Sequence, residues 1–303
     1  MVIEARELTK RYGHRLAVDH LTFNVQPGVV TGFLGPNGSG KSTTMRLLLG
    51  LDRADSGSAT FDGKPYRSYA RPLEEVGALL DAGYVHPTRT GFEHLHALAA
   101  SNRLPRRRVD EVLALVGLGE VGKKRVGTYS LGMKQRLGIA AAMLGNPRTL
   151  LFDEPANGLD PEGVRWIREF LKHLAREGRT VLVSSHQLAE MSQMADSLVV
   201  IGQGRLIEQC SVAEFVGRFA NAWVRVVSPQ MAVLSQLLGA RGANLDFENP
   251  NTARVTGMSA REVGEIAAAN GVVLHQLADT SGSLEEAYLQ VTQPTVEYRG
   301  RPQ

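Results

Sequence analysis

Short apolar runs alternate with segments of helical periodicity through roughly the first two-thirds of the chain. Three of these runs, residues 29–34, 149–152 and 180–183, are largely apolar and end just before polar residues. A run of this kind is typical of a parallel strand that helices cover on both faces. The pattern therefore predicts α/β layers, with polar residues gathered where the buried strands end.

Two other patterns surround these buried strands. Residues 2–8, 22–25 and 58–61 alternate apolar and polar positions, which predicts an antiparallel sheet beside the parallel one. From Gly91 to Gly145 the pattern is mostly helical and contains no convincing strand. We therefore expect a helical subdomain, at about residues 88–146, inside a larger domain that covers residues 1–220.

The pattern changes again over the last part of the chain. Capping boxes at Ser259–Glu262 and Ser283–Glu286 predict two helices, and a third is predicted at 229–238 with Ser228 as its cap. The predicted strands are residues 223–227, 245–247, 253–256 and 272–277. This βαββαβα order predicts a small ferredoxin-like, split-βαβ accessory domain at 221–293, followed by a disordered tail at 294–303.

Composition narrows the class of protein. With 303 residues and 43% of them hydrophobic, the chain can bury a large core, and its net charge of +3 is too slight to favour nucleic acid as a partner. Cys210 is the only cysteine, which excludes an intrachain disulfide and a cysteine-based metal cluster. We see no signal peptide and no apolar run near the ~18–20 residues of a membrane span. Any association with a membrane is therefore expected to come through a partner.

The strongest chemical signal follows the first buried strand and opens a helix. It matches the P-loop pattern G-x-x-x-x-G-K-[ST], and its residues are Gly35, Pro36, Asn37, Gly38, Ser39, Gly40, Lys41, Ser42 and Thr43. Backbone N–H groups of such a loop wrap phosphates, its lysine reaches the β- and γ-phosphates, and its serine can ligate Mg²⁺. The glycine spacing differs from that of a dinucleotide-binding loop. The loop therefore predicts ATP-type nucleotide binding.

Polar residues also follow the other two buried strands. Asp153 and Glu154 end the second, where Asp153 can hold Mg²⁺ through water and Glu154 can polarise an attacking water. The competing interpretation is an ordinary N-capping pair before Pro155. His186 follows the third strand; a lone histidine is more often structural, but at this sheet edge it can reach the same γ-phosphate.

Residues 128–136 look like half of a second phosphate site. Ser130 is a suitable N-cap and Gly132 leaves backbone N–H groups exposed, so the helix that follows attracts anions at its start. This loop has no P-loop of its own.

These motifs stand in the order found in ATP-binding-cassette ATPases, and the resemblance covers about two-thirds of the chain. It implies a P-loop NTPase fold with a RecA-like core, an antiparallel β subdomain and an α-helical subdomain. Residues 129–133 resemble the signature loop, which implies that Ser130 and Gly132 contact the γ-phosphate of ATP held by an opposing subunit. Asp160 resembles the loop that passes between two such sites. Tyr12 matches the aromatic that stacks on adenine, the alternative being a plain surface tyrosine.

The chain departs from the family pattern at two places. Leu131 and Met133 replace a glycine and a glutamine of the usual signature. Asp81 stands where family members usually carry a glutamine that touches Mg²⁺ and the attacking water; a shorter aspartate can still bind Mg²⁺ through water and suggests a slower or differently coupled ATPase. The variant signature and residues 282–289 resemble the exporters for bacitracin- and daunorubicin-like compounds, whose permease is a separate chain.

The leading hypothesis is the ATP-hydrolysing subunit of an exporter for a drug-like, antibiotic or lipid-like compound. It would form a homodimer with two shared ATP and Mg²⁺ sites and bind an integral membrane permease at the cytoplasmic face of the membrane. The alternative is a soluble cassette ATPase acting on ribosomes or DNA, against which stand the single P-loop and the absence of sustained heptads. A third hypothesis, a regulatory module that binds nucleotide but barely hydrolyses it, is favoured by Asp81 alone.

Overall fold

The computed structural model describes residues 1–81, 83, 85–219, 223–280 and 282–292. The described chain divides into two compact units, one covering Met1–Val212 and a second that begins at Ala213. The predicted tail at 294–303 lies outside the described residues. Within the described part of the chain, no helix is long and apolar enough to cross a membrane.

The first unit is built on a six-stranded sheet. Its strands, in spatial order, are β5 (Val76–Leu79), β6 (Thr149–Asp153), β7 (Thr180–Ser184), β3 (Val30–Leu34), β8 (Ser197–Gly202) and β9 (Arg205–Ser211). The first five are parallel and β9 is antiparallel to β8. The three apolar runs are neighbours in this sheet as β6, β7 and β3, and β3 and β7 are buried along their whole length. The expected buried parallel strands are confirmed.

A second, antiparallel sheet lies beside the first, as the alternating segments predict. Its order is β2 (Arg15–Val25), β1 (Ile3–Tyr12) and β4 (Ser56–Phe61). Short elements follow β4, namely η1 (Tyr66–Ser68) and α2 (Pro72–Glu75). The principal core forms where side chains of both sheets meet α1 (Lys41–Leu48).

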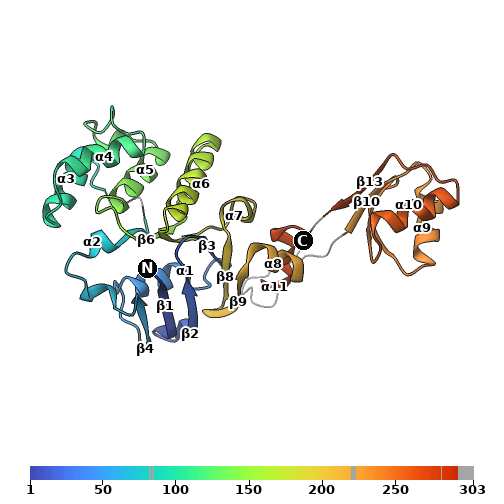
Figure 1. The fold of residues 1–303 in the computed structure, drawn as a ribbon, viewed down its shortest axis with the longest axis horizontal. Coiled ribbons are helices and arrows are strands. Elements are labelled where there is room, and N and C mark those ends of the chain that lie inside the picture. The colour runs from blue at the N-terminus through green and yellow to red at the C-terminus, as the bar shows by residue number, and fades with distance from the viewer. Residues whose placement is uncertain (82, 84, 220–222, 281, 293–303) are drawn as a thin grey trace. The chain divides into compact units, whose positions relative to one another are not determined.

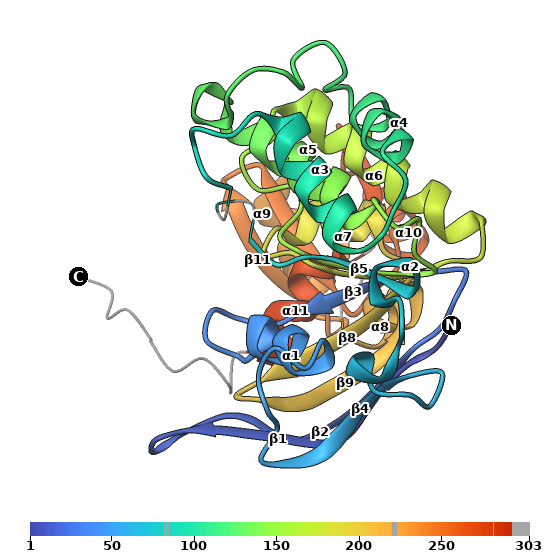
Figure 2. The ribbon, with the colours of Figure 1, turned by 90° about the vertical axis from the view of Figure 1, so that its left-hand side faces the viewer.

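The other large elements of this unit are helices (Figures 1 and 2). The segment from residue 91 to 145 is helical apart from loops and one isolated bridge between Thr90 and Arg125, which confirms the predicted helical subdomain. It contains α3 (Gly91–Ser101), α4 (Arg107–Leu115), η2 (Val126–Thr128) and α5 (Leu131–Ala142), and α3, α4 and α5 pack against one another. Two more helices follow, α6 (Pro161–Arg176) and α7 (Leu188–Met194).

The second unit has the predicted split-βαβ order. Its elements are α8 (Val212–Phe219, which begins at the junction), β10 (Trp223–Val227), α9 (Met231–Gly239), β11 (Asn244–Asn249), β12 (Thr252–Thr256), α10 (Ala260–Ala269), β13 (Gln276–Thr280) and α11 (Leu284–Thr292). The spatial order β11-β12-β10-β13 is antiparallel throughout. Val224 and Val226 of β10 point into a core that they share with α9 and α10. Both predicted capping boxes are present, at Ser259 and Ser283.

Two predicted boundaries in this unit are wrong, and one cluster of side chains explains both. The Ser228 hydroxyl accepts a hydrogen bond from Gln230 N at 3.1 Å, so residues 229–230 form a turn and the helix expected at 229–238 begins at Met231. The same hydroxyl donates to Val273 O at 2.8 Å, and Gln230 Oε1 accepts from Val273 N at 2.8 Å. Because side chains satisfy the backbone of Val273, the strand expected at 272–277 begins only at Gln276.

Candidate nucleotide site

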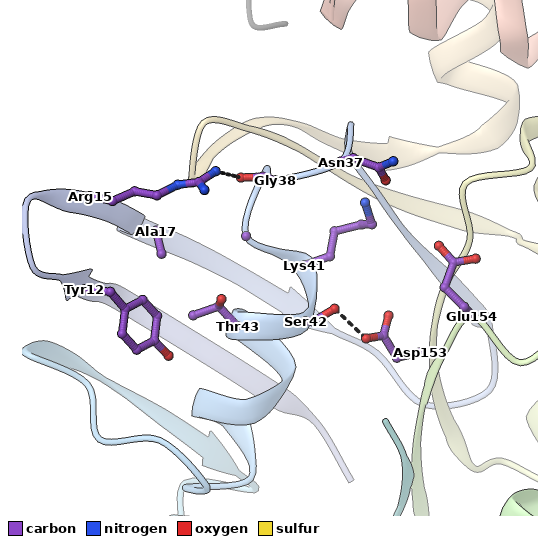
Figure 3. A pocket seen from close by; sticks show the side chains of 11 residues that line it. Tyr12, Arg15, Ala17, Asn37, Gly38, Lys41, Ser42, Thr43, Asp153 and Glu154 are labelled. Atoms are coloured by element: carbon purple, nitrogen blue, oxygen red, sulfur yellow. Dashed lines mark hydrogen bonds between the residues drawn. The ribbon is translucent and has the colours of Figure 1, made fainter. Parts of the chain in front are cut away.

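The P-loop is a tight turn between β3 and α1 that only glycine can make at two positions (Figure 3). Gly38 and Gly40 have φ angles of +81° and +102°, in the left-handed region. A Cβ atom at Gly40 would lie 2.4 Å from Ala17 O of β2. The loop is therefore pressed against β2, with its backbone wound around the start of α1.

Lys41 is the first residue of α1 and is only 9% exposed. Its Nζ donates hydrogen bonds to Gly35 O at 2.5 Å and to Pro36 O at 3.2 Å, both within its own loop. Burial lowers the pKa of Lys41, and the nearby carboxylates of Glu154 and Asp153 oppose that shift. The loop thus holds a largely desolvated cation beside the two carboxylates.

Asp153 lies at the end of β6, between two hydroxyl groups. Ser42 Oγ donates to Asp153 Oδ2 at 2.6 Å, and the Ser184 hydroxyl donates to Oδ1. Carboxylate and hydroxyl oxygens are ligands that suit Mg²⁺. The predicted metal-binding residues Ser42 and Asp153 are thus adjacent, and their chemistry fits this cation.

Glu154 follows directly and has an unusual backbone. Its φ angle is +52°, which is rare for a residue other than glycine. Glu154 N donates to Ser184 Oγ at 3.0 Å. Its carboxylate Oε2 lies 2.6 Å from His186 Nδ1 and accepts from His186 N at 3.4 Å. The structure therefore brings together the polar residues that follow β6 and β7, as the strand pattern predicts.

The P-loop, the two carboxylates and nearby residues of β1 and β2 surround a cavity of about 420 Å³ (Figure 3). It is lined by Tyr12, Arg15, Ala17, Asn37, Gly38, Gly40, Lys41, Ser42, Thr43, Asp153 and Glu154. Sequence reasoning missed Arg15 and Ala17, which no motif marks. They line the cavity because β2 runs beside the P-loop, where an Arg15 guanidinium nitrogen donates to Gly38 O at 3.2 Å.

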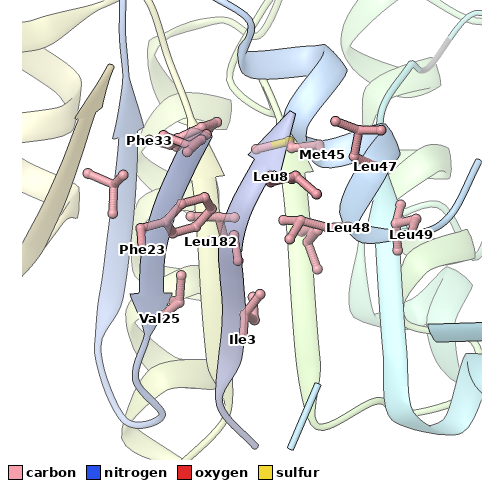
Figure 4. Close-up of a cluster of buried hydrophobic side chains, with 14 of the residues drawn as sticks. Ile3, Leu8, Phe23, Val25, Phe33, Met45, Leu47, Leu48, Leu49 and Leu182 are labelled. Atoms are coloured by element: carbon pink, nitrogen blue, oxygen red, sulfur yellow. The ribbon is translucent and has the colours of Figure 1, made fainter. Parts of the chain in front are cut away.

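Buried apolar side chains of both sheets pack against α1, the helix that the P-loop opens (Figure 4). Phe23 and Phe33 stack with ring centroids 5.5 Å apart, joining the antiparallel sheet to β3. Met45 and Leu48 of α1 are fully buried in the same cluster. The helix that begins at Lys41 is therefore fixed by its apolar face, which also fixes the position of its first turn.

Tyr12 stands at the far side of the cavity with its hydroxyl group bound and 47% of its surface exposed. Its hydroxyl donates to Asp52 Oδ2 at 2.7 Å, and Arg46 Nε donates to the same oxygen at 2.8 Å. The ion pair with Arg46 and the hydrogen bond from Tyr12 lower the pKa of Asp52 to about 2. The ring is thereby held in one orientation, with part of its surface open for stacking.

Eight of the predicted site residues do not line the cavity: Gly35, Pro36 and Ser39 of the P-loop, His186, which contacts Glu154, and Asp81, Ser130, Gly132 and Asp160. Asp81 is exposed, and its Oδ1 accepts from Gly83 N at 2.6 Å. Ser130 caps α5 and accepts from Met133 N at 3.2 Å, with Gly132 in the first turn of the same helix. Asp160 caps α6 by accepting from Gly163 N at 2.8 Å.

Comparisons with known proteins agree with this arrangement. A family model described as "ABC transporter" matches residues 18–157, and a model described as a domain of unknown function matches residues 222–285. An uncharacterized ABC transporter ATP-binding protein, YhcH, of Bacillus subtilis (strain 168) is 34% identical over 98% of this chain and 97% of its own length. The bacitracin transport ATP-binding protein BcrA of Enterococcus faecalis is 36% identical over 95% of each chain.

A lantibiotic transport ATP-binding protein, SrtF, of Streptococcus pyogenes is 35% identical over 68% of this chain and 89% of its own. Among solved structures, one described as the ATP-binding subunit of an ABC transporter superposes with a TM-score of 0.65 at 26% identity. It covers 72% of this chain and 93% of that one. The match confirms the expected P-loop NTPase fold.

The low pKa of Asp52 makes a prediction about stability. Its pKa falls from an ordinary 3.8 to about 2 on folding, so the ionised form stabilises the fold above pH 4. That contribution is lost as the pH falls through about 2. We expect Asp52→Asn to lower the free energy of unfolding at pH 6 by about 1–2 kcal/mol, a value reduced for partial exposure. Denaturant titrations of both proteins between pH 6 and pH 3 measure their free energies of unfolding. The difference between the two free energies should narrow below pH 4. A difference that does not change with pH would contradict the low pKa of Asp52.

Proposed function

Because this chain belongs to the family of ATP-binding proteins of ABC transporters, we propose that it is the ATP-hydrolysing subunit of an exporter. The observation that carries the proposal is the meeting of Lys41, Asp153, Glu154 and His186 where three adjacent parallel strands end. The membrane permease would be a separate polypeptide.

The residues divide the work of hydrolysis among them. ATP phosphates lie in the N–H groups of the P-loop, and the Lys41 ammonium exchanges its carbonyl partners for phosphate oxygens. Ser42 and Asp153 would hold Mg²⁺, which neutralises phosphate charge when bound. Tyr12 stacks on the adenine ring.

Glu154 acts as general base. It accepts a proton from the water that attacks the γ-phosphorus, while the bond from phosphorus to the ADP oxygen breaks, giving ADP and phosphate. His186 Nδ1 lies 2.6 Å from Glu154 Oε2, and the His186 ring would contact the γ-phosphate. A positioned base and a polarising group together account for hydrolysis at this edge of the sheet.

That Asp81 binds Mg²⁺ through water remains a prediction. Its carboxylate would have to release Gly83 N to serve that role. The surface around residues 81–90 and the helices after it form the proposed contact with the permease.

The second half of each phosphate site is proposed to come from a second copy of the chain. Ser130 caps α5 and Gly132 lies in its first turn, and Asp160 lies in the loop that would pass between the two sites. ATP binding closes such a dimer around two nucleotides, and hydrolysis lets it reopen. The second unit, from Ala213 onward, is proposed to support dimerisation or regulation.

The exported compound is proposed to be an antibiotic-like peptide, because relatives that match much of this chain are named for bacitracin or lantibiotic transport. The protein would then work peripherally, at the cytoplasmic face of the membrane, through its permease. The alternative of a cassette acting on ribosomes or DNA is not favoured, because the full-length relatives carry transporter names.

We expect Glu154→Gln to lower the rate of ATP hydrolysis at least a hundredfold while preserving ATP binding, because only the base is lost. With ATP and Mg²⁺ this variant should accumulate as a dimer, measured by size-exclusion chromatography with light scattering. Lys41→Ala serves as the control: it should hydrolyse no ATP and stay monomeric. An unchanged hydrolysis rate in Glu154→Gln would contradict the assignment of the base.

The exporter proposal makes a separate prediction about partners. Affinity purification of the tagged chain from detergent-solubilised membranes should recover a polytopic membrane protein in stoichiometric amount. Recovery of ribosomes or DNA without a membrane protein would instead support the soluble alternative.

A further inference from the structure

Glu154 is held by more than the cluster that faces the cavity. Its carbonyl oxygen accepts a hydrogen bond from Gln135 Nε2 at 2.9 Å. Gln135 lies in the second turn of α5, and only 5% of it is exposed. A buried amide is costly unless it is paired, so this contact fixes the Gln135 side chain against Glu154.

The hydrogen bond from Gln135 does more than satisfy a buried carbonyl group. Asn157 N already donates to the Glu154 carbonyl at 3.1 Å. The two peptide groups that flank Glu154 are therefore both held: the carbonyl oxygen accepts from Asn157 and Gln135, and Glu154 N donates to Ser184 Oγ at 3.0 Å. A φ of +52° at a non-glycine residue is strained and persists only when its surroundings impose it.

The same face of α5 contacts the segment after Glu154 at a second point. Leu131 and Gln135 are four residues apart and so share one face of the helix. A Cβ atom at Gly158 would lie 2.2 Å from Leu131 Cδ2, which places the Leu131 side chain directly against that glycine. One helical face thus rests on the chain from Glu154 to Gly158.

We propose that Gln135 is a positioning residue for the catalytic base, linking the helix that begins at Ser130 to the backbone of Glu154. The inference rests on the proposed role of Glu154. Its consequence is that α5 couples two sites: a phosphate of the neighbouring subunit bound at Ser130 fixes α5, and α5 orients the base of its own subunit. Rotation of the Glu154 peptide would swing the carboxylate away from His186.

The test is a double-mutant cycle with Gln135→Leu and Glu154→Gln. Leucine has nearly the volume of glutamine but donates no hydrogen bond, so Gln135→Leu should lower kcat roughly tenfold or more and leave the Kd for a fluorescent ATP analogue within about twofold. In the Glu154→Gln background the same substitution should cause no further loss, measured by single-turnover hydrolysis at high enzyme concentration. Gln193→Leu, the same replacement at an exposed position of α7, is the matched control. It should leave unchanged the kcat, the Kd for the ATP analogue and the single-turnover rate in the Glu154→Gln background.

The outcomes separate this inference from the proposed function. A merely structural role would lower the melting temperature and reduce hydrolysis by the same factor in both backgrounds, which would overturn the inference. An unchanged kcat in Gln135→Leu would also overturn it while leaving Glu154 as base. If Glu154→Gln alone hydrolyses ATP at the normal rate, the assignment of Glu154 as the base fails first, and Gln135 has no base to position.

Discussion

The pairing register of three adjacent parallel strands decides where the catalytic groups meet. Asp153, the last residue of β6, is paired with Ser184 of β7, and Ser184 is paired with Phe33 of β3. Because parallel strands end at the same edge of a sheet, the residues that follow them are brought within hydrogen-bonding distance. A slip of one residue in β6 would turn the Asp153 side chain to the opposite face of the sheet and separate it from Ser42.

The same edge concentrates charge in a partly buried place. Lys41 loses hydration there and is compensated by its own loop carbonyls and by two carboxylates. This arrangement suits a ligand that brings several negative charges and removes the carbonyl partners of the lysine. The strained backbone of Glu154 is held at the same edge by two contacts, one with Ser184 of β7 and one with Gln135 of α5.

Much of the fold and of the site could be predicted from sequence, for physical reasons that differ among the residues. The buried strands and the P-loop are local patterns, since the hydrophobic period and the required glycines are visible in a few residues. Arg15, Ala17 and Gln135 reach the site only through tertiary packing, so no local pattern marks them. The starts of α9 and β13 were misplaced because Ser228 and Gln230 bind Val273, more than forty residues away. Asp81 Oδ1 accepts from Gly83 N in its own turn, and the role of Asp81 as a ligand of Mg²⁺ through water stays a prediction.

The central claim is that each ATP is shared between the P-loop of one copy and the Ser130 loop of another. Lys41→Ala disables the first half of a site, and Ser130→Glu places a repelling carboxylate in the second. Each variant alone should be inactive, but a mixed dimer of the two keeps one site with both halves intact. Steady-state phosphate release from an equal mixture should therefore recover to at most about half of the unmodified rate, because each mixed dimer contains one site with both halves intact. A mixture as inactive as its components would contradict the shared site.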